Sequence, residues 1–150
     1  MIENIIGIIA AVVGTVGFAL MLRLRKERLP VIAVSTALCY GLYLLCIHFS
    51  IAYIGAVFIA SLFAGFVSEF LAIYIKAPVT VFLTPTILPL VPGSSLYYTI
   101  EAYFQGNLDG ALLHFAALGK TIGAILLGIV FVNTIMKCIR NYKATKNLVE

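Results

Sequence analysis

Apolar residues along this chain form long runs separated by short polar stretches, without the two-residue alternation of half-buried strands. The runs cover residues 5–22, 29–49, 51–74, 77–100 and 111–136. Each run approaches or exceeds the ~20 residues that a helix needs to cross the hydrocarbon of a bilayer. The pattern predicts an all-α integral membrane protein, a bundle of about five transmembrane helices in a single domain over residues 1–150. Four spans plus a re-entrant loop is the main alternative.

The fourth run is interrupted by Pro85, Pro89, Pro92 and Gly93. Each proline inside a helix removes the N–H that would bond to the carbonyl four residues earlier. Broken backbone is tolerated at membrane depth where protein or a water-filled cavity surrounds it. We therefore expect two half-helices around an unwound centre, the first ending near residues 82–84 and the second capped by Ser94 or Ser95. The alternative is a proline-kinked helix that merely shapes the bundle.

The broken span is the first place to look for a binding site. The N-terminus of a half-helix presents free N–H groups and the positive end of a dipole, which suit a carboxylate. Secondary transporters bind substrates at such breaks. The hypothesis is a site for an amino acid or another small carboxylate. Its candidate substrate-binding residues are Thr84, Thr86, Pro89, Pro92, Gly93, Ser94, Ser95 and Tyr97.

Two charged residues lie within apolar runs. Glu69 is one to two turns from the end of the third run. A carboxylate inside the membrane costs on the order of 2.5–3.5 kcal/mol near the centre, so it normally faces a partner or water. Glu69 is therefore a candidate for coupling or partner contact, and the alternative is an interfacial carboxylate paired with Lys76. Lys120 is a second such candidate, although a lysine there can also extend to the interface.

The distribution of charge predicts the orientation. The chain is 63% hydrophobic with a formal net charge of +4, and its mean hydropathy is +1.12. This charge lies in short loops, which indicates membrane orientation and no nucleic-acid partner. Lysine and arginine concentrate on the cytoplasmic side, so the N-terminus is expected outside and the C-terminus inside. The residues expected inside are Arg23, Arg25, Lys26, Arg28, Lys76, Lys137, Arg140, Lys143 and Lys146, those expected outside are Glu3, Glu101 and Asp109, and Lys120 is the exception to this pattern.

Small residues at helical spacing indicate tight helix packing. Close backbone approach drives association where lipid supplies no hydrophobic force. Three of the runs carry such faces. Separately, Asp109 is a candidate N-cap of the helix in the fifth run. The three faces are Gly7, Ala11 and Gly14; Ser61 and Gly65; and Gly119 and Gly123.

No motif indicates catalysis, a metal or a cofactor. Glycine-rich phosphate loops, HExxH and GxSxG are absent from the sequence. Cys39, Cys46 and Cys138 form no CxxC pair and are interpreted as small buried hydrophobes. His48 and His114 fall near helix ends and belong to no ligand pattern. We expect no enzyme.

One segment carries a family resemblance. Several stretches of it can be compared with a known family: Ser68-Glu69-Phe70-Leu71-Ala72, Lys76-Ala77-Pro78-Val79-Thr80-Val81-Phe82, Pro85, Ile87-Leu88-Pro89-Leu90-Val91-Pro92-Gly93 and Tyr97-Tyr98. Together they resemble the threonine/serine exporter family. The whole chain is similar to its small split subunit, which corresponds to the C-terminal membrane part of full-length exporters. The resemblance implies a bacterial inner-membrane exporter of threonine and serine that works with a larger subunit. Related split pairs are associated with succinate export.

The resemblance also agrees with the size of the chain. Five spans contain no internal inverted repeat, and many transporters alternate access between two related halves. A larger exporter subunit or a homo-oligomer is therefore expected, together with coupling to the proton motive force. The alternative function is a membrane scaffold or assembly subunit that transports nothing.

Overall fold

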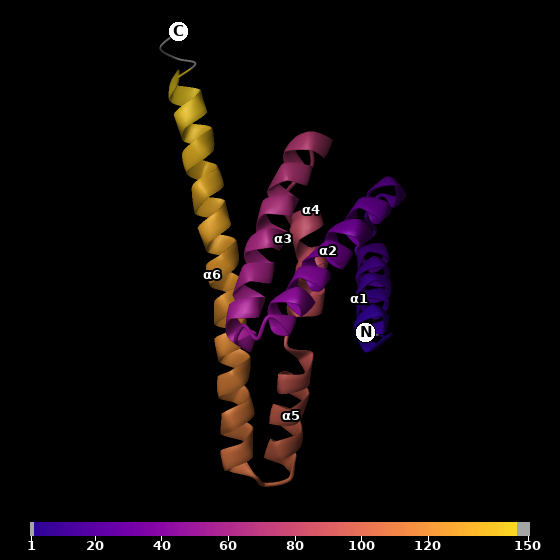
Figure 1. Cartoon of the computed structure of the whole chain (residues 1–150), viewed down its shortest axis with the longest axis vertical. Coiled ribbons are helices and arrows are strands. Elements are labelled where there is room, and N and C mark those ends of the chain that lie inside the picture. The colour runs from indigo at the N-terminus through magenta and orange to yellow at the C-terminus, as the bar shows by residue number, and fades with distance from the viewer. Residues whose placement is uncertain (1, 147–150) are drawn as a thin grey trace.

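All regular secondary structure among the described residues is helical (Figure 1). The computed structural model describes the backbone of residues 2–146 and the side chains of residues 4–142. The side chains of Glu3, Lys143 and Lys146 therefore lie outside the described part. The elements are α1 (Ile2–Met21), η1 (Lys26–Arg28), α2 (Leu29–His48), α3 (Tyr53–Ile75), α4 (Thr80–Ile87), η2 (Leu88–Leu90), α5 (Gly93–Phe104) and α6 (Leu108–Lys146).

The predicted all-α membrane architecture is confirmed. Within the described residues, α1, α2, α3 and α6 are long and apolar enough to cross a membrane. We call the end of the bundle where α1 ends, α2 begins, α3 ends and α4 begins the basic end, and the opposite end the far end. The loops at the basic end carry Arg23, Arg25, Lys26, Arg28 and Lys76.

The fourth span is made of three short pieces. The helices α4, η2 and α5 have 8, 3 and 12 residues, and Val91 between η2 and α5 is extended. α4 lies beside α3, and α5 continues in the same direction beyond the far end of α3 (Figure 1). The segment therefore passes from the basic end to the far end and does not turn back on itself as a re-entrant loop would.

Two predictions about the break are wrong. The first half-helix does not end at residues 82–84, because α4 continues through Pro85 to Ile87. Pro85 lacks an N–H, so the helix loses one hydrogen bond there and still continues. After Ile87 the chain forms the tighter 3-10 helix η2, where the Leu88 N–H donates to the Pro85 carbonyl. Ser94 and Ser95 do not cap α5, because that helix begins at Gly93 after Pro92 and has no side-chain cap.

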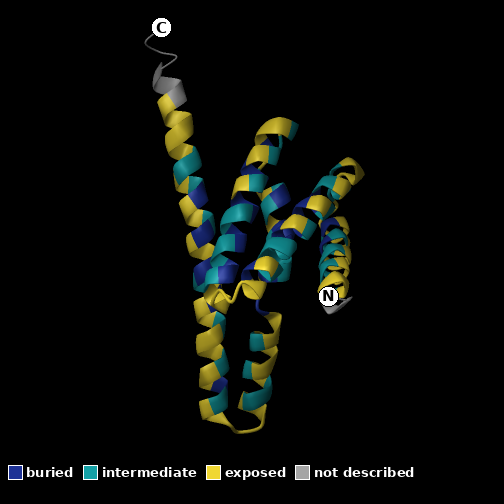
Figure 2. Cartoon of the chain, in the orientation of Figure 1, coloured by how far each residue is buried: buried dark blue, intermediate teal, exposed yellow. Residues whose placement is uncertain are grey.

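α6 is longer than the predicted span 111–136. It has 39 residues, or roughly 58 Å at 1.5 Å per residue, about twice the ~30 Å hydrocarbon thickness. Its side-chain cap is Asn107 rather than Asp109, because Asn107 Oδ1 accepts the Gly110 N–H at 3.0 Å. The first part of α6 forms an antiparallel hairpin with α5 that extends beyond the far end of α1–α3 and is largely exposed (Figures 1 and 2).

The contact between α3 and α6 is a close approach of two helix backbones. A Cβ built on Gly128 would overlap Ser61 Oγ, and one on Gly65 would lie 3.1 Å from Val132 Cβ. Both contacts have the same offset in sequence, so the two helices run parallel and Tyr53 lies level with Lys120. The small face at Ser61 and Gly65 is therefore a packing surface, as predicted.

The other two small faces differ from the prediction. Gly119 and Gly123 have no neighbouring atom within 4 Å of an ideal Cβ, so the glycine that packs on α3 is Gly128. In α1, a Cβ on Gly7 would lie 3.3 Å from the Tyr40 ring, whereas Gly14 again has nothing within 4 Å. GxxxG spacing does not say which side of a helix meets a neighbour.

The core consists of two apolar clusters stacked along the bundle. α4 lies at the centre, in contact with α1, α2 and α3. The basic-end cluster contains Ala19, Ile32, Ala72 and Phe82. The central cluster contains Cys39, Val57, Ala60, Ala64, Leu90, Ala124 and Ile125.

Candidate functional site

Between the two apolar clusters lies a layer of buried hydroxyl groups. Each of the four residues of the basic-end cluster has a serine or threonine four residues further from the basic end on its own helix. Residues four apart share a helix face, so the four hydroxyl side chains occupy the same inward faces one turn deeper. Cys39, Ala64 and Leu90 of the central cluster follow one further turn on. We call these four residues the hydroxyl layer: Thr15, Thr36, Ser68 and Thr86, with 0%, 0%, 0% and 1% of their surfaces exposed.

The hydroxyl layer is set apart by its missing hydrogen bonds. Among the described residues, none of its four side-chain oxygens has a partner. Other hydroxyls in this chain bond to their own helix: Ser35 donates to the Val31 carbonyl at 2.8 Å and Thr121 to the Ala117 carbonyl at 3.0 Å. That local bond is the usual solution in an apolar helix. A buried polar group left unsatisfied costs about 1–3 kcal/mol, so four together at one depth indicate a site for a polar ligand.

The depth of the layer is consistent across all four helices. Each hydroxyl residue lies six or seven residues from the basic end of its helix, which is roughly 10 Å at 1.5 Å per residue. Measured from the helix ends, this distance is about a third of the ~30 Å hydrocarbon thickness of a bilayer. Thr86 follows Pro85, which leaves the Val81 carbonyl without its ordinary i+4 donor. A weakened α4 thus carries one wall of the site.

Glu69 lies next to the hydroxyl layer on α3. It follows Ser68 in sequence and has 3% of its surface exposed. No hydrogen bond or ion pair joins it to another described residue. Because it follows Gly65 by four residues, it lies on the side of α3 that packs against α6. A carboxylate held this deep is costly unless a proton or a cation neutralises it.

The predicted site residues separate into three groups. Thr86 belongs to the hydroxyl layer. In the same broken span Pro85 and Pro92 are buried and Pro89 is half-buried. Ser95 and Lys120 line one cavity near the far end. The remaining candidates contribute no side chain to either place: Thr84, Gly93, Ser94 and Tyr97.

Sequence reasoning missed Thr15, Thr36 and Ser68. A single serine or threonine in an apolar helix is common, and nothing in its neighbours marks it. A signal was nevertheless present, because each residue stands at the same distance from the basic loops on successive helices. Comparing depth across spans would have placed them at the same level as Thr86, but not on the same inward side.

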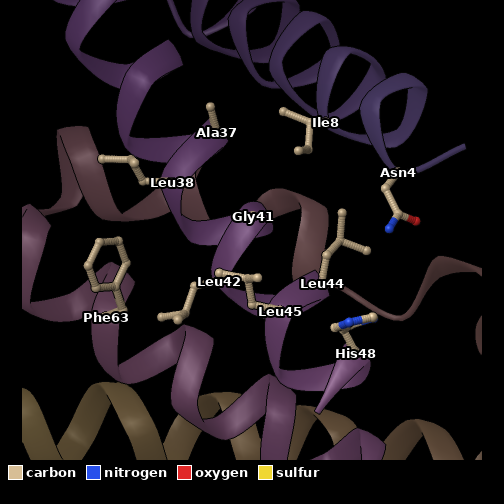
Figure 3. Close-up of a pocket in the computed structure, with 10 residues that line it drawn as sticks. All are labelled: Asn4, Ile8, Ala37, Leu38, Gly41, Leu42, Leu44, Leu45, His48 and Phe63. Atoms are coloured by element: carbon tan, nitrogen blue, oxygen red, sulfur yellow. The ribbon is translucent and has the colours of Figure 1, made fainter. Parts of the chain in front are cut away.

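A larger pocket lies between α1 and α2, with a volume of about 700 Å³ (Figure 3). Its side chains are almost all aliphatic, and its polar residues, Asn4 and His48, lie together toward one side. Such a surface suits an acyl chain or an apolar helix better than a charged solute. We therefore assign the polar chemistry to the hydroxyl layer. The described residues contain no group of three or more His, Cys, Asp or Glu side chains that could hold a metal.

Comparison with known proteins bears on the function of the chain. No solved structure matches the chain. The family model described as threonine/serine exporter, ThrE, matches residues 7–135. This match covers most of α1, all of α2 to α5 and most of α6, including every residue of the hydroxyl layer. A transporter family is consistent with the expectation of no enzyme. The chain belongs to the threonine/serine exporter family.

Proposed function

We propose that this chain is the membrane subunit of a secondary exporter for small amino or carboxylic acids. Threonine and serine are the first candidate substrates, and succinate is a third. Transport is coupled to the proton motive force and needs a larger subunit or a second copy of the chain. The observation that carries the proposal is the layer of four buried, unpartnered hydroxyls on four different helices.

Hydroxyl groups suit such substrates because each can both donate and accept a hydrogen bond. The carboxylate, the ammonium group and the side-chain hydroxyl of threonine or serine can all be recognised by this chemistry. Thr86 lies on the proline-containing helix, so movement of α4 would change access to the layer. Glu69, next to Ser68, is the candidate for the proton that couples export to the gradient.

The proposed orientation of the chain in the membrane follows the charges of the loops. Arg23, Arg25, Lys26 and Arg28 at the basic end favour the cytoplasmic side of a bacterial inner membrane. The N-terminus is then outside and the C-terminus inside. The hydroxyl layer lies nearer the basic end, which is the side from which an exporter loads its substrate.

The test is counterflow of labelled threonine, serine and succinate in proteoliposomes, with and without a larger exporter subunit. Thr86→Val removes the hydroxyl and keeps the side-chain shape. We expect flux to fall about fivefold or more, the equivalent of one neutral hydrogen bond, while stability rises by about 1 kcal/mol. Thr134→Val is the matched control, because Thr134 is exposed on α6 and bonds to the Val130 carbonyl.

Two results would contradict the proposal. One is the absence of transport of all three substrates in the paired system, which would favour the scaffold function. The other is normal flux in Thr86→Val and in Ser68→Ala, which would remove the hydroxyl layer from the substrate path. Loss of flux with lower stability would instead indicate a structural role for the hydroxyls.

A further inference from the structure

A second polar cavity lies toward the far end of the bundle, where α3 and α5 begin beside α6. Its volume is about 450 Å³, within the range of small-molecule sites. Its polar lining comes from all three helices: Tyr53 of α3, Ser95 of α5, and His114, Lys120 and Thr121 of α6. Tyr98 of α5 packs on the His114 ring with their centroids 5.5 Å apart. We call this space the Lys120 cavity.

The Lys120 cavity carries positive charge that no acid balances. No aspartate or glutamate lines it, and Lys120 makes no ion pair with any described residue. The acidic residue of α5, Glu101, lies further toward the hairpin tip and accepts a hydrogen bond from Gln105 at 3.3 Å. The titratable groups that face the cavity are therefore Tyr53, His114 and Lys120. This set favours an anion.

Backbone donors add to the charge of Lys120. The Gly93 N–H donates to the Val91 carbonyl and the Leu96 N–H to the Pro92 carbonyl. The N–H groups of Ser94 and Ser95 have no acceptor among the described residues. Because α5 is antiparallel to α6 and Tyr98 is level with His114, these donors lie toward Lys120. Free N–H groups and a lysine are common partners of a carboxylate.

We propose that the Lys120 cavity is a second binding site, which holds the carboxylate of the substrate near the far end of the bundle. This inference rests on the proposed export function. The broken span connects the two sites, because its α4 half carries Thr86 and its α5 half carries Ser95. The hydroxyl layer receives the substrate nearer the basic end, and Lys120 receives its carboxylate before release.

The test measures charge selectivity at Ser95. The purified full chain carries Ser95→Cys, with the exposed Cys138 replaced by serine; Cys39 and Cys46 are buried. Negatively and positively charged methanethiosulfonate reagents are compared by their rates of modification. We expect the negative reagent to react faster, and Lys120→Gln to lower the ratio of the two rates by about tenfold, from the loss of one nearby charge. Lys120→Arg should keep the ratio.

Position 105 supplies the matched control. Gln105 is exposed at the tip of the hairpin, away from Lys120, so Lys120→Gln should leave the reagent ratio at Gln105→Cys unchanged. Threonine should slow the modification of Ser95→Cys, whereas threoninamide, which lacks the carboxylate, should not. Lys137→Gln at the other end of α6 should preserve this protection.

The outcomes separate this inference from the proposed function. An equal ratio of rates with and without Lys120, or equal protection by threonine and threoninamide, overturns the Lys120 cavity as a carboxylate site. Transport that depends on Thr86 but not on Lys120 would leave the hydroxyl layer in place and remove the second site. Charge selectivity and threonine protection at Ser95 in a chain that transports nothing would support the site and contradict export.

Discussion

The substitution Gly128→Ala tests the packing that positions α6. Gly128 is buried against α3, where a new methyl would overlap Ser61 Oγ and lie 3.1 Å from Ser61 Cβ and 3.2 Å from the Leu62 backbone nitrogen. The oxygen of Ser61 can rotate away, but the Cβ and the backbone nitrogen cannot. The two helices must therefore separate by a few tenths of an ångström, or Ser61 must give up its 2.8 Å hydrogen bond to the Phe58 carbonyl.

Three effects set the expected change in the free energy of unfolding. Overpacking of a tight contact costs about 1–3 kcal/mol, and loss of the Ser61 hydrogen bond would cost about 0.5–1.5 kcal/mol. Replacing glycine by alanine in a helix returns up to about 1 kcal/mol. The control Gly123→Ala receives the same propensity gain without a clash, because nothing lies within 4 Å of its ideal Cβ. The difference between the two variants should be about 2 kcal/mol, with Gly128→Ala less stable.

The assay is denaturant unfolding of the purified chain in mixed micelles, followed by far-ultraviolet circular dichroism. A second variant tests the assigned contact, since Ser61→Gly in the Gly128→Ala background removes the overlapping side chain. We expect this pair of changes to recover part of the lost free energy of unfolding, because the Leu62 backbone nitrogen stays in place and the new helix glycine costs up to about 1 kcal/mol. Equal stability of Gly128→Ala and Gly123→Ala would refute the reasoning, and so would failure of Ser61→Gly to compensate.

Three further predictions concern single residues. Asn107→Ala should cost about 1 kcal/mol, because the capping bond to the Gly110 N–H is lost; Asp109→Ala should cost less, and the reverse order in thermal unfolding would contradict the assignment of the cap. Pro85→Ala supplies an N–H four residues after the Val81 carbonyl, so the amide introduced there should exchange slowly with deuterium, and fast exchange would show that α4 opens at this point. Glu69→Gln removes the ionisable group of a buried side chain and keeps the shape of that side chain, so export should lose its response to an imposed proton gradient without loss of stability. Flux that still follows the gradient would exclude Glu69 from coupling.

Some features of the fold followed directly from local sequence. Long apolar runs can be satisfied only by membrane-spanning helices, because lipid offers no hydrogen-bond partner to the backbone. Pro85, Pro89 and Pro92 each had to remove one backbone hydrogen bond from the fourth span, since each lacks an N–H. The positions of the interruptions were less certain, because helical tightening at Leu88 let α4 continue past Pro85. A local rule says that a bond is missing, and neighbouring packing decides how the chain adjusts.

The residues of the candidate site, by contrast, could be predicted from local sequence only in part. Thr86 was predicted because it lies in the proline-rich segment, whereas Thr15, Thr36 and Ser68 have ordinary surroundings in sequence. Their common depth and missing partners depend on α1, α2 and α3 meeting around α4. In the same way, Ser95 and Lys120 come from two distant segments that are joined in one cavity by the α5–α6 hairpin.

The sequence by itself thus determined the membrane class, the broken fourth span and the basic loops, because hydropathy, the missing N–H of proline and charge act over neighbouring residues. Only the tertiary structure decided which polar residues share a site and which glycine touches another helix. Those properties depend on the rotation and register of each helix against its neighbours. In this chain, packing between helices leaves four hydroxyls without partners, and no single apolar run reveals that.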